Sequence, residues 1–423
     1  MSYSSRIMIY DFIMEPDKKN VLYITYDSLT SPLGQSQVLS YIYKLNQRGV
    51  DFTILSFENE EFCTAEKEIE LSDRLHKEGI SWIKLSYHKE PPLFSTLFDI
   101  WKGYQRGKRI VNNTPITIIH TRSYVPQLIG ALLKGKCKAK LVFDIRGFWF
   151  DERVEGGLWK KDGLLFKVGK KIEKYLYKKA DAVIVLTHNA KKTLLEYSFL
   201  KKQSKDIHVI PTCVDGEIFQ KARKSEAMET KYRLDFLSEK DFVLLYLGSL
   251  GTWYLLDEML DFYSCLKKNF KNPAFLFVTH SDHNLLREKL REKNILNAHI
   301  ISADSKDIPS ILKFTDASIL FYKPLFSKKA TCPTKLGESL AAGLPVIINS
   351  GIGDTESLVE EHNVGVVVRE FSLEHFEEKS KTFLNTFLSD ETKKRCENLA
   401  REEFNIESAV NTYLEVYGGE LKR

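Results

Sequence analysis

The chain has 423 residues, of which 43% are hydrophobic and 28% charged, the proportions of a soluble globular protein. The net charge of +5 is too mild to indicate a nucleic-acid partner, and six scattered cysteines without a C-x-x-C pair argue against a zinc site or a disulfide scaffold. No run approaches the roughly 18 apolar residues that a membrane span requires. Because single cores rarely grow beyond about 250–300 residues, we expect two domains. The cysteine pattern fits the reducing cytoplasm, and we expect neither a metal nor another cofactor.

The first twenty residues, MSYSSRIMIYDFIMEPDKKN, do not follow the charged, apolar and small order of a secretory signal peptide. The segment contains only a short apolar run, and the acidic residues Glu15 and Asp17 follow that run directly. We interpret this segment as a loosely packed extension or an extra edge strand.

The stretch that follows alternates strand and helix signals. Residues 21–29, VLYITYDSL, and 50–58, VDFTILSFE, are β-branched and aromatic runs that predict strands. Between them, a loop with Gly34 leads into a helix with apolar residues spaced by three and four, for which Ser36 or Gln35 is the expected cap. This order opens a doubly wound α/β domain, in which ligands bind at the carboxyl ends of strands. Gly34 and Gln35 therefore lie where a ligand is expected, unless the glycine serves only to form the turn.

Two later strands of the first half end in polar residues. TPITIIHTR ends at His120 and Arg122, and AKLVFDIRGFW ends its strand at Asp144 and Arg146 before two aromatic residues. The aromatic residues are Phe148 and Trp149. The pair Asp144 and Arg146 and the aromatic residues in this one loop form either a substrate wall or a buried ion pair beside core aromatics, and the residue pattern leaves both interpretations open.

Residues 163–181 predict a helix whose polar positions are mostly lysines. The lysines in and just before it are Lys160, Lys161, Lys167, Lys170, Lys171, Lys174, Lys178 and Lys179. This pattern is usually a solvated helix face, but beside aromatic residues it also suits an anionic membrane leaflet. The helix at 160–179 is therefore a candidate for peripheral contact with the inner face of the membrane.

The second half restarts the same pattern. Residues 215–240 are polar and lack strong periodicity, so we place the connection between domains there. DFVLLYLGSLG then predicts a strand and a glycine loop, which brings Gly248 and Ser249 to a strand end. Residues 406–417 have the apolar spacing of an amphipathic helix that follows the second sheet.

The stretch SKKATCPTKLGESLAAGLPVII, residues 327–348, predicts a loop, a helix, a second loop and a buried strand. Pro333 suits the first helical position, which places Thr331 or Cys332 near the cap, and Gly343 suits the residue after the helix.

The start of this helix is suited to an anion. Its free N–H groups follow two lysines, Lys328 and Lys329, and Glu338 lies one turn inside the helix. The alternative is an ordinary loop–helix–strand unit with a solvated acid and solvated lysines.

The order of these motifs resembles a known family. IPTCVDGEIF at the junction, YLGSLG opening the second half and PTKLGESLAAGLPVI near its end resemble the GT-B glycosyltransferases of retaining family 4. RGFWFDERVEGGLW and GIGDTESLVEEHNVGVVV resemble a bacterial subgroup of that family. The resemblance implies two Rossmann-like doubly wound domains that face each other across a cleft. We expect an acceptor-side domain over 1–212, a nucleotide-sugar domain over 213–400, and a C-terminal helix over 401–423 that crosses back to the first domain.

The resemblance also implies roles for single residues. Glu338 matches a glutamate that accepts hydrogen bonds from the donor ribose, and Gly34 matches the first-domain loop that closes on the donor. The helix start that faces the diphosphate is matched by Thr334, Lys335 and Leu336. A family histidine near a first-domain strand end has no clear match here: His120 is one candidate, and Asp144 occupies a similar strand-end position. The catalytic candidates are Glu338, Asp144, Arg146 and His120.

Besides the histidine, two further departures from the family pattern concern the donor side. Ala330 occupies the position of the earlier glutamate of an E-x7-E motif, and the loop SLGTWYLLDE lacks the Arg and Lys that usually neutralise the diphosphate. Lys328, Lys329 or Lys335 could supply that charge instead.

The implied function is transfer of a sugar from a nucleotide-sugar to a glycan or lipid-linked acceptor, in the synthesis of surface polysaccharides or glycoconjugates. Two alternatives remain: a GT-B sugar-nucleotide epimerase, and a non-catalytic nucleotide-sugar-binding protein. The donor-side candidates are Gly34, Gln35, Gly248, Ser249, Lys328, Lys329, Thr334, Lys335, Leu336 and Glu338, and the acceptor-side candidates are Phe148 and Trp149.

Overall fold

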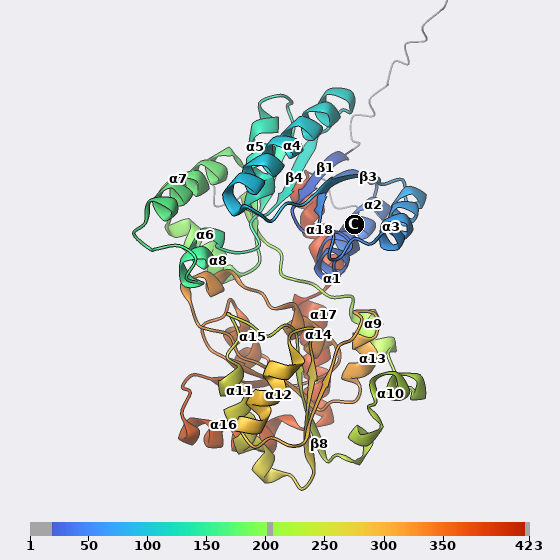
Figure 1. The fold of residues 1–423 in the computed structure, drawn as a ribbon, viewed down its shortest axis with the longest axis vertical. Coiled ribbons are helices and arrows are strands. Elements are labelled where there is room, and N and C mark those ends of the chain that lie inside the picture. Colours follow the sequence, from blue (N-terminus) through green and yellow to red (C-terminus); the bar gives the residue numbers. More distant parts are fainter. Residues whose placement is uncertain (1–18, 201–205, 419–423) are drawn as a thin grey trace, which may run out of the picture.

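The computed structural model describes residues 19–200 and 206–418. They form two α/β domains, one above the other in Figure 1, which confirms the predicted fold class. The predicted N-terminal extension or edge strand lies outside the described residues.

The first domain is built on a seven-stranded sheet in the order β3-β2-β1-β4-β5-β6-β7, with every neighbouring pair parallel. Its strands are β1 (Lys19–Thr25), β2 (Val50–Glu58), β3 (Ser81–Ser86), β4 (Ile118–Arg122), β5 (Lys140–Asp144), β6 (Ala182–Val185) and β7 (Ile207–Val209). Most strand residues near the middle of the sheet are buried because helices cover both faces.

The helices of the first domain are α1 (Pro32–Gly34), α2 (Ser40–Gln47), α3 (Ala65–Lys77), α4 (Pro92–Asn113), α5 (Tyr124–Lys134), α6 (Trp149–Glu155), α7 (Leu164–Lys179) and α8 (His188–Glu196). A π-helical stretch, Gln35–Leu39 (η1), joins α1 to α2.

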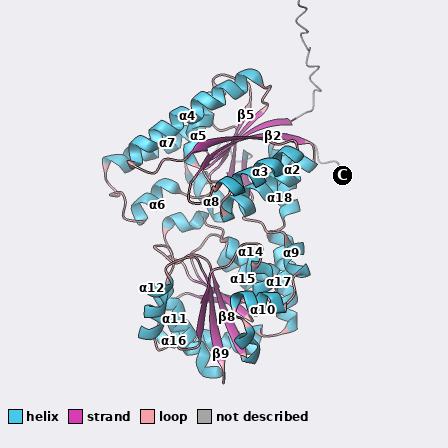
Figure 2. Ribbon diagram, turned by 45° about the vertical axis from the view of Figure 1, so that its right-hand side comes forward, coloured by secondary structure: helices cyan, strands magenta, loops and turns pink. Residues whose placement is uncertain are grey.

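The second domain repeats this design on a six-stranded parallel sheet in the order β10-β9-β8-β11-β12-β13. Its strands are β8 (Phe242–Leu247), β9 (Pro273–Val278), β10 (Ala298–Ile301), β11 (Ala317–Leu320), β12 (Val346–Asn349) and β13 (Gly365–Val368). Figure 2 shows the strands of this domain as one layer with helices on both sides. An apolar core therefore fills each side of the sheet.

The helices of the second domain are α9 (Gly216–Lys221), α10 (Glu226–Tyr232), α11 (Leu256–Leu266), α12 (His283–Glu292), α13 (Ile308–Leu312), α14 (Thr334–Ala341), α15 (Thr355–Glu361), α16 (Leu373–Phe387) and α17 (Asp390–Glu403). Short 3-10 turns are η3 (Asp235–Glu239), η4 (Lys267–Asn269) and η5 (Phe326–Ala330).

The chain passes between the domains twice, and the two passages lie side by side. Val214 forms a parallel bridge with Asn405, and its N–H donates to the carbonyl of Phe404 over 2.9 Å. After this passage, α18 (Ile406–Val416) packs on α2 within the core of the first domain. The last helix of the described chain thus belongs to the first domain, although the second domain precedes it.

Three local predictions were wrong. Ser31, rather than Ser36 or Gln35, caps the first helix, because its Oγ accepts from the N–H of Gly34 at 3.0 Å. Pro333 is the cap residue of α14 and not its first helical residue.

The third error concerns the link between domains. The polar stretch at 215–240 folds into α9, α10 and η3 of the second domain, and its Phe219 and Leu237 enter that domain's core. The connection between the domains is therefore shorter than predicted. Short helices are stabilised mainly by packing, so a few buried apolar residues are enough to hold α9, α10 and η3 on the core of the second domain.

Candidate active site

The start of α14 and the glycine loop after β8 meet at the carboxyl edge of the second sheet. Gly248 has a φ of +137°, and a Cβ placed on it would lie 2.9 Å from Cε of Lys335. The lysine stem therefore runs directly over the backbone of the loop. Pro333 offers no side-chain hydrogen bond to the first turn of α14, so the N–H groups of Thr334 and Lys335 have no side-chain cap. The positive charge of Lys335 and the positive end of the α14 dipole thus lie together beside the loop at Gly248.

Glu338 lies one turn further along α14 and is half-buried. Burial raises the pKa of this carboxyl group above its ordinary value of 4.5, and nearby Lys335 opposes that rise. A carboxylate there accepts two O–H donors, which suits a diol such as ribose. Leu336, between the two, is buried in the core and anchors the helix.

The two other candidate lysines lie on η5, and only one of them is free. Lys328 is 5% exposed, its Nζ donates to Glu152 of the first domain over 2.9 Å, and it lies 4.0 Å from the ring centre of Trp253. Lys328 therefore already pairs with a carboxylate of the first domain, and its contact with the donor stays a prediction. Lys329 is exposed and lies over the ring of Phe326. Ser249, after Gly248, is also exposed.

The polar strand ends of the first domain form a buried charge cluster. Asp144 is 0% exposed and lies 3.4 Å from Nη1 of Arg146, 3.7 Å from Nη1 of Arg122 and 3.9 Å from Nε2 of His120. Burial by itself would raise the pKa of Asp144, but Arg146, His120 and Arg122 together hold it below its ordinary value. Asp144 is therefore the counter-ion of the cluster.

His120 is equally buried and serves the same cluster. Its ring stacks on Tyr23, and Nδ1 lies 2.7 Å from the hydroxyl of Tyr417, just after α18. Burial lowers the pKa of His120, so the ring is neutral near pH 7. The interpretation as a buried ion pair, left open from the sequence, applies to Asp144 and Arg146, whereas His120 is a neutral member of the cluster. Nε2 of His120 and Oδ1 of Asp144 are buried without a hydrogen-bond partner in the described structure, and a catalytic role for either residue stays a prediction.

Arg146 is less buried than His120 and Asp144, the other predicted catalytic residues of this cluster. It is half-buried and has a φ of +56°, a conformation that costs a non-glycine residue about 1 kcal/mol or more. Asp144 holds its guanidinium, and Arg122 in turn donates from Nε to Asp27 over 2.6 Å. Sequence reasoning assigned no role to Asp27 or Arg122; their positions at the ends of β1 and β4 were the available signal.

Gly34 and Gln35 are fully engaged within the first domain. A Cβ on Gly34 would lie 2.1 Å from the carbonyl oxygen of Ser28, so glycine is required there by the packing of its own loop. Gln35 donates to the carbonyl of Leu29 over 2.7 Å and accepts from Arg74 over 2.7 Å. The alternative that Gly34 forms the turn is thus sufficient to explain this residue.

Phe148 does not form an acceptor wall. It is 1% exposed and stacks on Phe326 of η5, with ring centres 5.5 Å apart. The prediction was wrong because the loop after β5 turns its first aromatic side chain into the contact between domains. Trp149 is half-buried among Tyr124 and Trp159, with the guanidinium of Arg153 over its ring.

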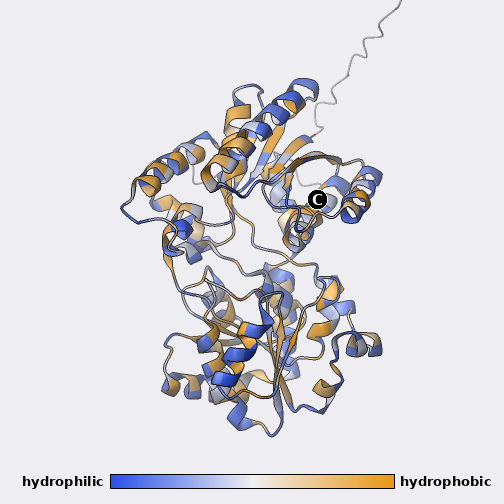
Figure 3. Ribbon diagram, viewed as in Figure 1, coloured by the Kyte–Doolittle hydropathy of each residue, from blue (hydrophilic) through white to orange (hydrophobic). Residues whose placement is uncertain are grey.

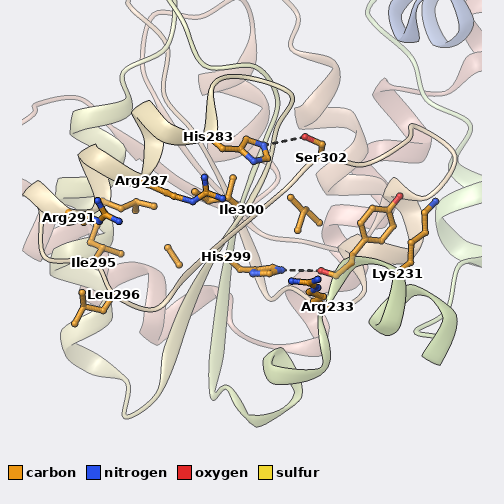
Figure 4. Close-up of a pocket in the computed structure, with 14 residues that line it drawn as sticks. Lys231, Arg233, His283, Arg287, Arg291, Ile295, Leu296, His299, Ile300 and Ser302 are labelled. Carbon is orange, nitrogen blue, oxygen red and sulfur yellow. Dashed lines mark hydrogen bonds between the residues drawn. The ribbon is translucent and has the colours of Figure 1, made fainter.

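A cavity of about 610 Å³ lies elsewhere, along the free edge of β10. Figure 4 shows Arg287 and Arg291 of α12, His299 of β10 and Arg233 around it. None of the residues predicted to bind the donor lines this cavity, so it is separate from the site at α14.

Comparison with known proteins identifies the type of protein. The family model Glycosyltransferase Family 4 matches residues 34–217, and the model Glycosyl transferases group 1 matches residues 229–403. An uncharacterized glycosyltransferase of Methanocaldococcus jannaschii is 24% identical over 331 residues, which are 77% of this chain and 80% of that protein.

Solved structures agree on the fold. HepE of Anabaena, solved with UDP and glucose, has a TM-score of 0.66 at 14% identity, over 95% of this chain and 99% of that chain. Sucrose-phosphate synthase of Thermosynechococcus elongatus has a TM-score of 0.70 at 13% identity, over 95% and 98% of the two chains. Family models match both halves of the chain, and the solved structures share its two-domain fold. The chain therefore belongs to the GT-B glycosyltransferases of the family 4 type.

Proposed function

We propose that this glycosyltransferase moves a hexosyl group from a nucleotide-sugar to a glycan or lipid-linked acceptor. The observation that carries this proposal is the position of Lys335 over Gly248, beside the uncapped start of α14 and one turn from Glu338. These groups match a nucleoside diphosphate: cationic and N–H groups for the diphosphate, and a carboxylate for the ribose hydroxyls. The HepE structures hold UDP or UDP-glucose, which supports a donor of this class.

The chemistry follows from the charges. Cleavage of the bond between sugar and phosphate leaves negative charge on the departing diphosphate, which Lys335 and the N–H groups of α14 stabilise. We assign this task to protein groups rather than to a metal, and turnover is therefore expected to persist in a chelator. We propose that the configuration of the anomeric carbon is retained, with the departing phosphate taking the acceptor's proton on the same face. We propose that Arg146 of the first domain steadies the same charge.

We further propose that the acceptor is reached at the inner face of a membrane, in the synthesis of a surface polysaccharide or glycoconjugate. On α7, Leu164 and Leu165 are exposed among lysines, with Leu164 at 78%. The first half of α4 also exposes apolar residues, which are Leu93, Phe94, Leu97, Phe98 and Trp101. Both helices contact α5 and so belong to one side of the first domain, and Figure 3 shows apolar and polar segments mixed on each. Apolar and cationic side chains together suit an anionic leaflet. None of the described helices is long and apolar enough to cross a bilayer.

The test is turnover of candidate nucleotide-sugars with a panel of glycan and lipid-linked acceptors. We expect release of the nucleoside diphosphate that depends on an acceptor, with a product whose anomeric configuration matches that of the donor by NMR. An inverted product would refute retention. Conversion of the donor to its epimer without an acceptor would identify an epimerase, and binding without any conversion would identify a non-catalytic protein.

A further inference from the structure

We infer that Glu152 and Glu155 of α6 are positioning residues that clamp the second domain against the first through η5. Both belong to the RGFWFDERVE motif, and their partners belong to the SKKATCPTKLGE motif. The two motifs lie about 170 residues apart in the chain and meet in the structure.

The first half of the clamp is a carboxylate over the start of η5. Both oxygens of Glu155 accept from the backbone N–H of Ser327 at 3.2 Å, and Oε2 also accepts from the Ser327 hydroxyl. Ser327 is fully buried. Hydrogen bonds to a charged acceptor are stronger than neutral ones, so Glu155 holds the backbone of η5 and not merely a flexible side chain.

The second half is a buried cation. Nζ of Lys328 lies between Glu152, at 2.9 Å, and the face of Trp253, 4.0 Å from the ring centre. Trp253 itself fits against Gly156 at the end of α6, where a Cβ would lie 3.1 Å from the indole ring. A lysine enclosed by a carboxylate and an aromatic ring binds both more strongly than an exposed pair would.

A neighbouring contact extends the clamp to α8. The Thr187 hydroxyl donates to the carbonyl of Lys329 over 2.6 Å. Asp354 of the second domain accepts from the N–H groups of His188 and Asn189 at 2.6 and 3.0 Å, at the start of α8. A carboxylate at a helix N-terminus is a favourable pairing, and here it crosses between domains.

The clamp explains both donor-side departures from the family pattern. Ala330 is 1% exposed and packs in the core of the first domain, where a glutamate would bury a charge. Trp253 occupies the loop in which the family carries its basic pair, and its ring faces Lys328. These positions serve the contact between domains and not the donor.

The clamp sets the distance from the donor groups on α14 to Arg146 in the first domain. Loss of the clamp should leave the donor site intact, because Lys335, Gly248 and Glu338 all lie in the second domain. Without the clamp, the donor groups on α14 and Arg146 of the first domain should no longer be held in a fixed relative position. Such misplacement of reacting groups lowers the rate of the chemical step.

The experiment compares wild type, the double variant Glu152→Gln/Glu155→Gln and the control Glu217→Gln, whose carboxylate forms an exposed pair within α9. Small-angle X-ray scattering without ligand should match this structure for wild type and for the control, and should show a larger radius of gyration for the double variant. The kinetic part rests on the proposed function: kcat should fall about tenfold or more, while the Kd for the nucleoside diphosphate changes less than about twofold.

An unchanged scattering curve for a folded double variant would overturn the clamp, as would a wild type that is already extended. If the double variant does not fold by circular dichroism, Lys328→Met, which keeps an apolar stem on Trp253, is expected to open the domains in the same way. Failure of every nucleoside diphosphate to bind would refute the proposed donor but leave the scattering result standing, so the two failures are distinguishable.

Discussion

Glu338 combines an acceptor role with an unfavourable position in the free protein. No described ion pair compensates its carboxylate, and burial raises its pKa. A group whose pKa is raised on folding contributes stability at low pH that is lost as the pH rises through the folded pKa. The same carboxylate is needed ionised to accept the ribose hydroxyls. Stability and donor binding therefore make opposite demands on this residue.

We predict that Glu338→Gln raises the melting temperature of the free protein at pH 7–8 and weakens nucleoside diphosphate binding by roughly ten- to a hundredfold, the equivalent of about 1.5–3 kcal/mol for a hydrogen bond to a charged group. Calorimetry against pH should show that wild-type affinity declines on acidification before the pH reaches 4.5, the ordinary pKa of the group. The variant should show no such decline over that range. Equal affinity and equal pH dependence would remove Glu338 from the donor site.

Gly248 provides a second test at the same site. Gly248→Ala places a methyl group 2.9 Å from Cε of Lys335 at a φ of +137°, so the lysine must move away from the loop. Nucleoside diphosphate affinity should fall by about tenfold or more, since Lys335 no longer faces the helix start. Gly251→Ala in the same loop is the matched control, because its Cβ meets no atom within 4 Å. Similar affinity of the two variants in calorimetry would show that Lys335 is not held by this contact.

Asp144 is the counter-ion of the buried cluster, and its lowered pKa contributes stability above its ordinary value of 3.8. That contribution is lost as the pH falls through the folded value. Asp144→Asn should lower the free energy of unfolding at pH 7 by about 3–5 kcal/mol, because Arg122 and Arg146 lose their shared partner. The difference from wild type in denaturant titrations should narrow below pH 3.8. A constant difference across that range would mean that the charge of Asp144 is not what stabilises the protein.

At the scale of elements, α4 and α7 carry the prediction of membrane contact. Wild type should sediment with anionic vesicles at low salt, be partly released at high salt, and not bind neutral vesicles. Phe94→Ser/Trp101→Ser should lose most of this binding, because both side chains are exposed and apolar on α4. Leu285→Ser is the control, since Leu285 is exposed to a similar degree on α12 of the other domain. Equal sedimentation of both variants would favour a solvated surface.

Elements also show what a sequence can and cannot predict. The alternation of β-branched strands with amphipathic helices predicted both sheets, because parallel strands buried on two faces leave a strong pattern. The caps at Ser31 and Pro333 were misplaced by one to several residues, because several neighbouring residues were equally suitable caps. The exposure of the apolar face of α4 was not predicted. A sequence shows that a helix has an apolar face, but only the tertiary structure shows whether other helices or strands cover that face.

In the whole molecule, the placement of Lys335 and Glu338 on one helix could be predicted, and the contact between domains could not. Lys335 and Glu338 lie on one helix, so their spacing alone places them together. Lys328 has the same local context as an anion-binding lysine, and only the tertiary fold brings Glu152 within 2.9 Å of it. Phe148 was misread for the same reason, since its partner Phe326 belongs to the other domain.

The proposed function depends on the groups at the start of α14, which we propose bind the nucleoside diphosphate part of the donor. The most direct measurement is a thermal-shift screen of nucleoside diphosphates and nucleotide-sugars, followed by calorimetry on wild type and Lys335→Ala. A ligand that binds only the folded state raises the melting temperature by mass action. We predict that one base is preferred and that Lys335→Ala weakens binding of its diphosphate by about tenfold or more. The proposed donor site would be refuted if no nucleotide shifted the melting temperature, or if Lys335→Ala bound the preferred diphosphate as tightly as wild type.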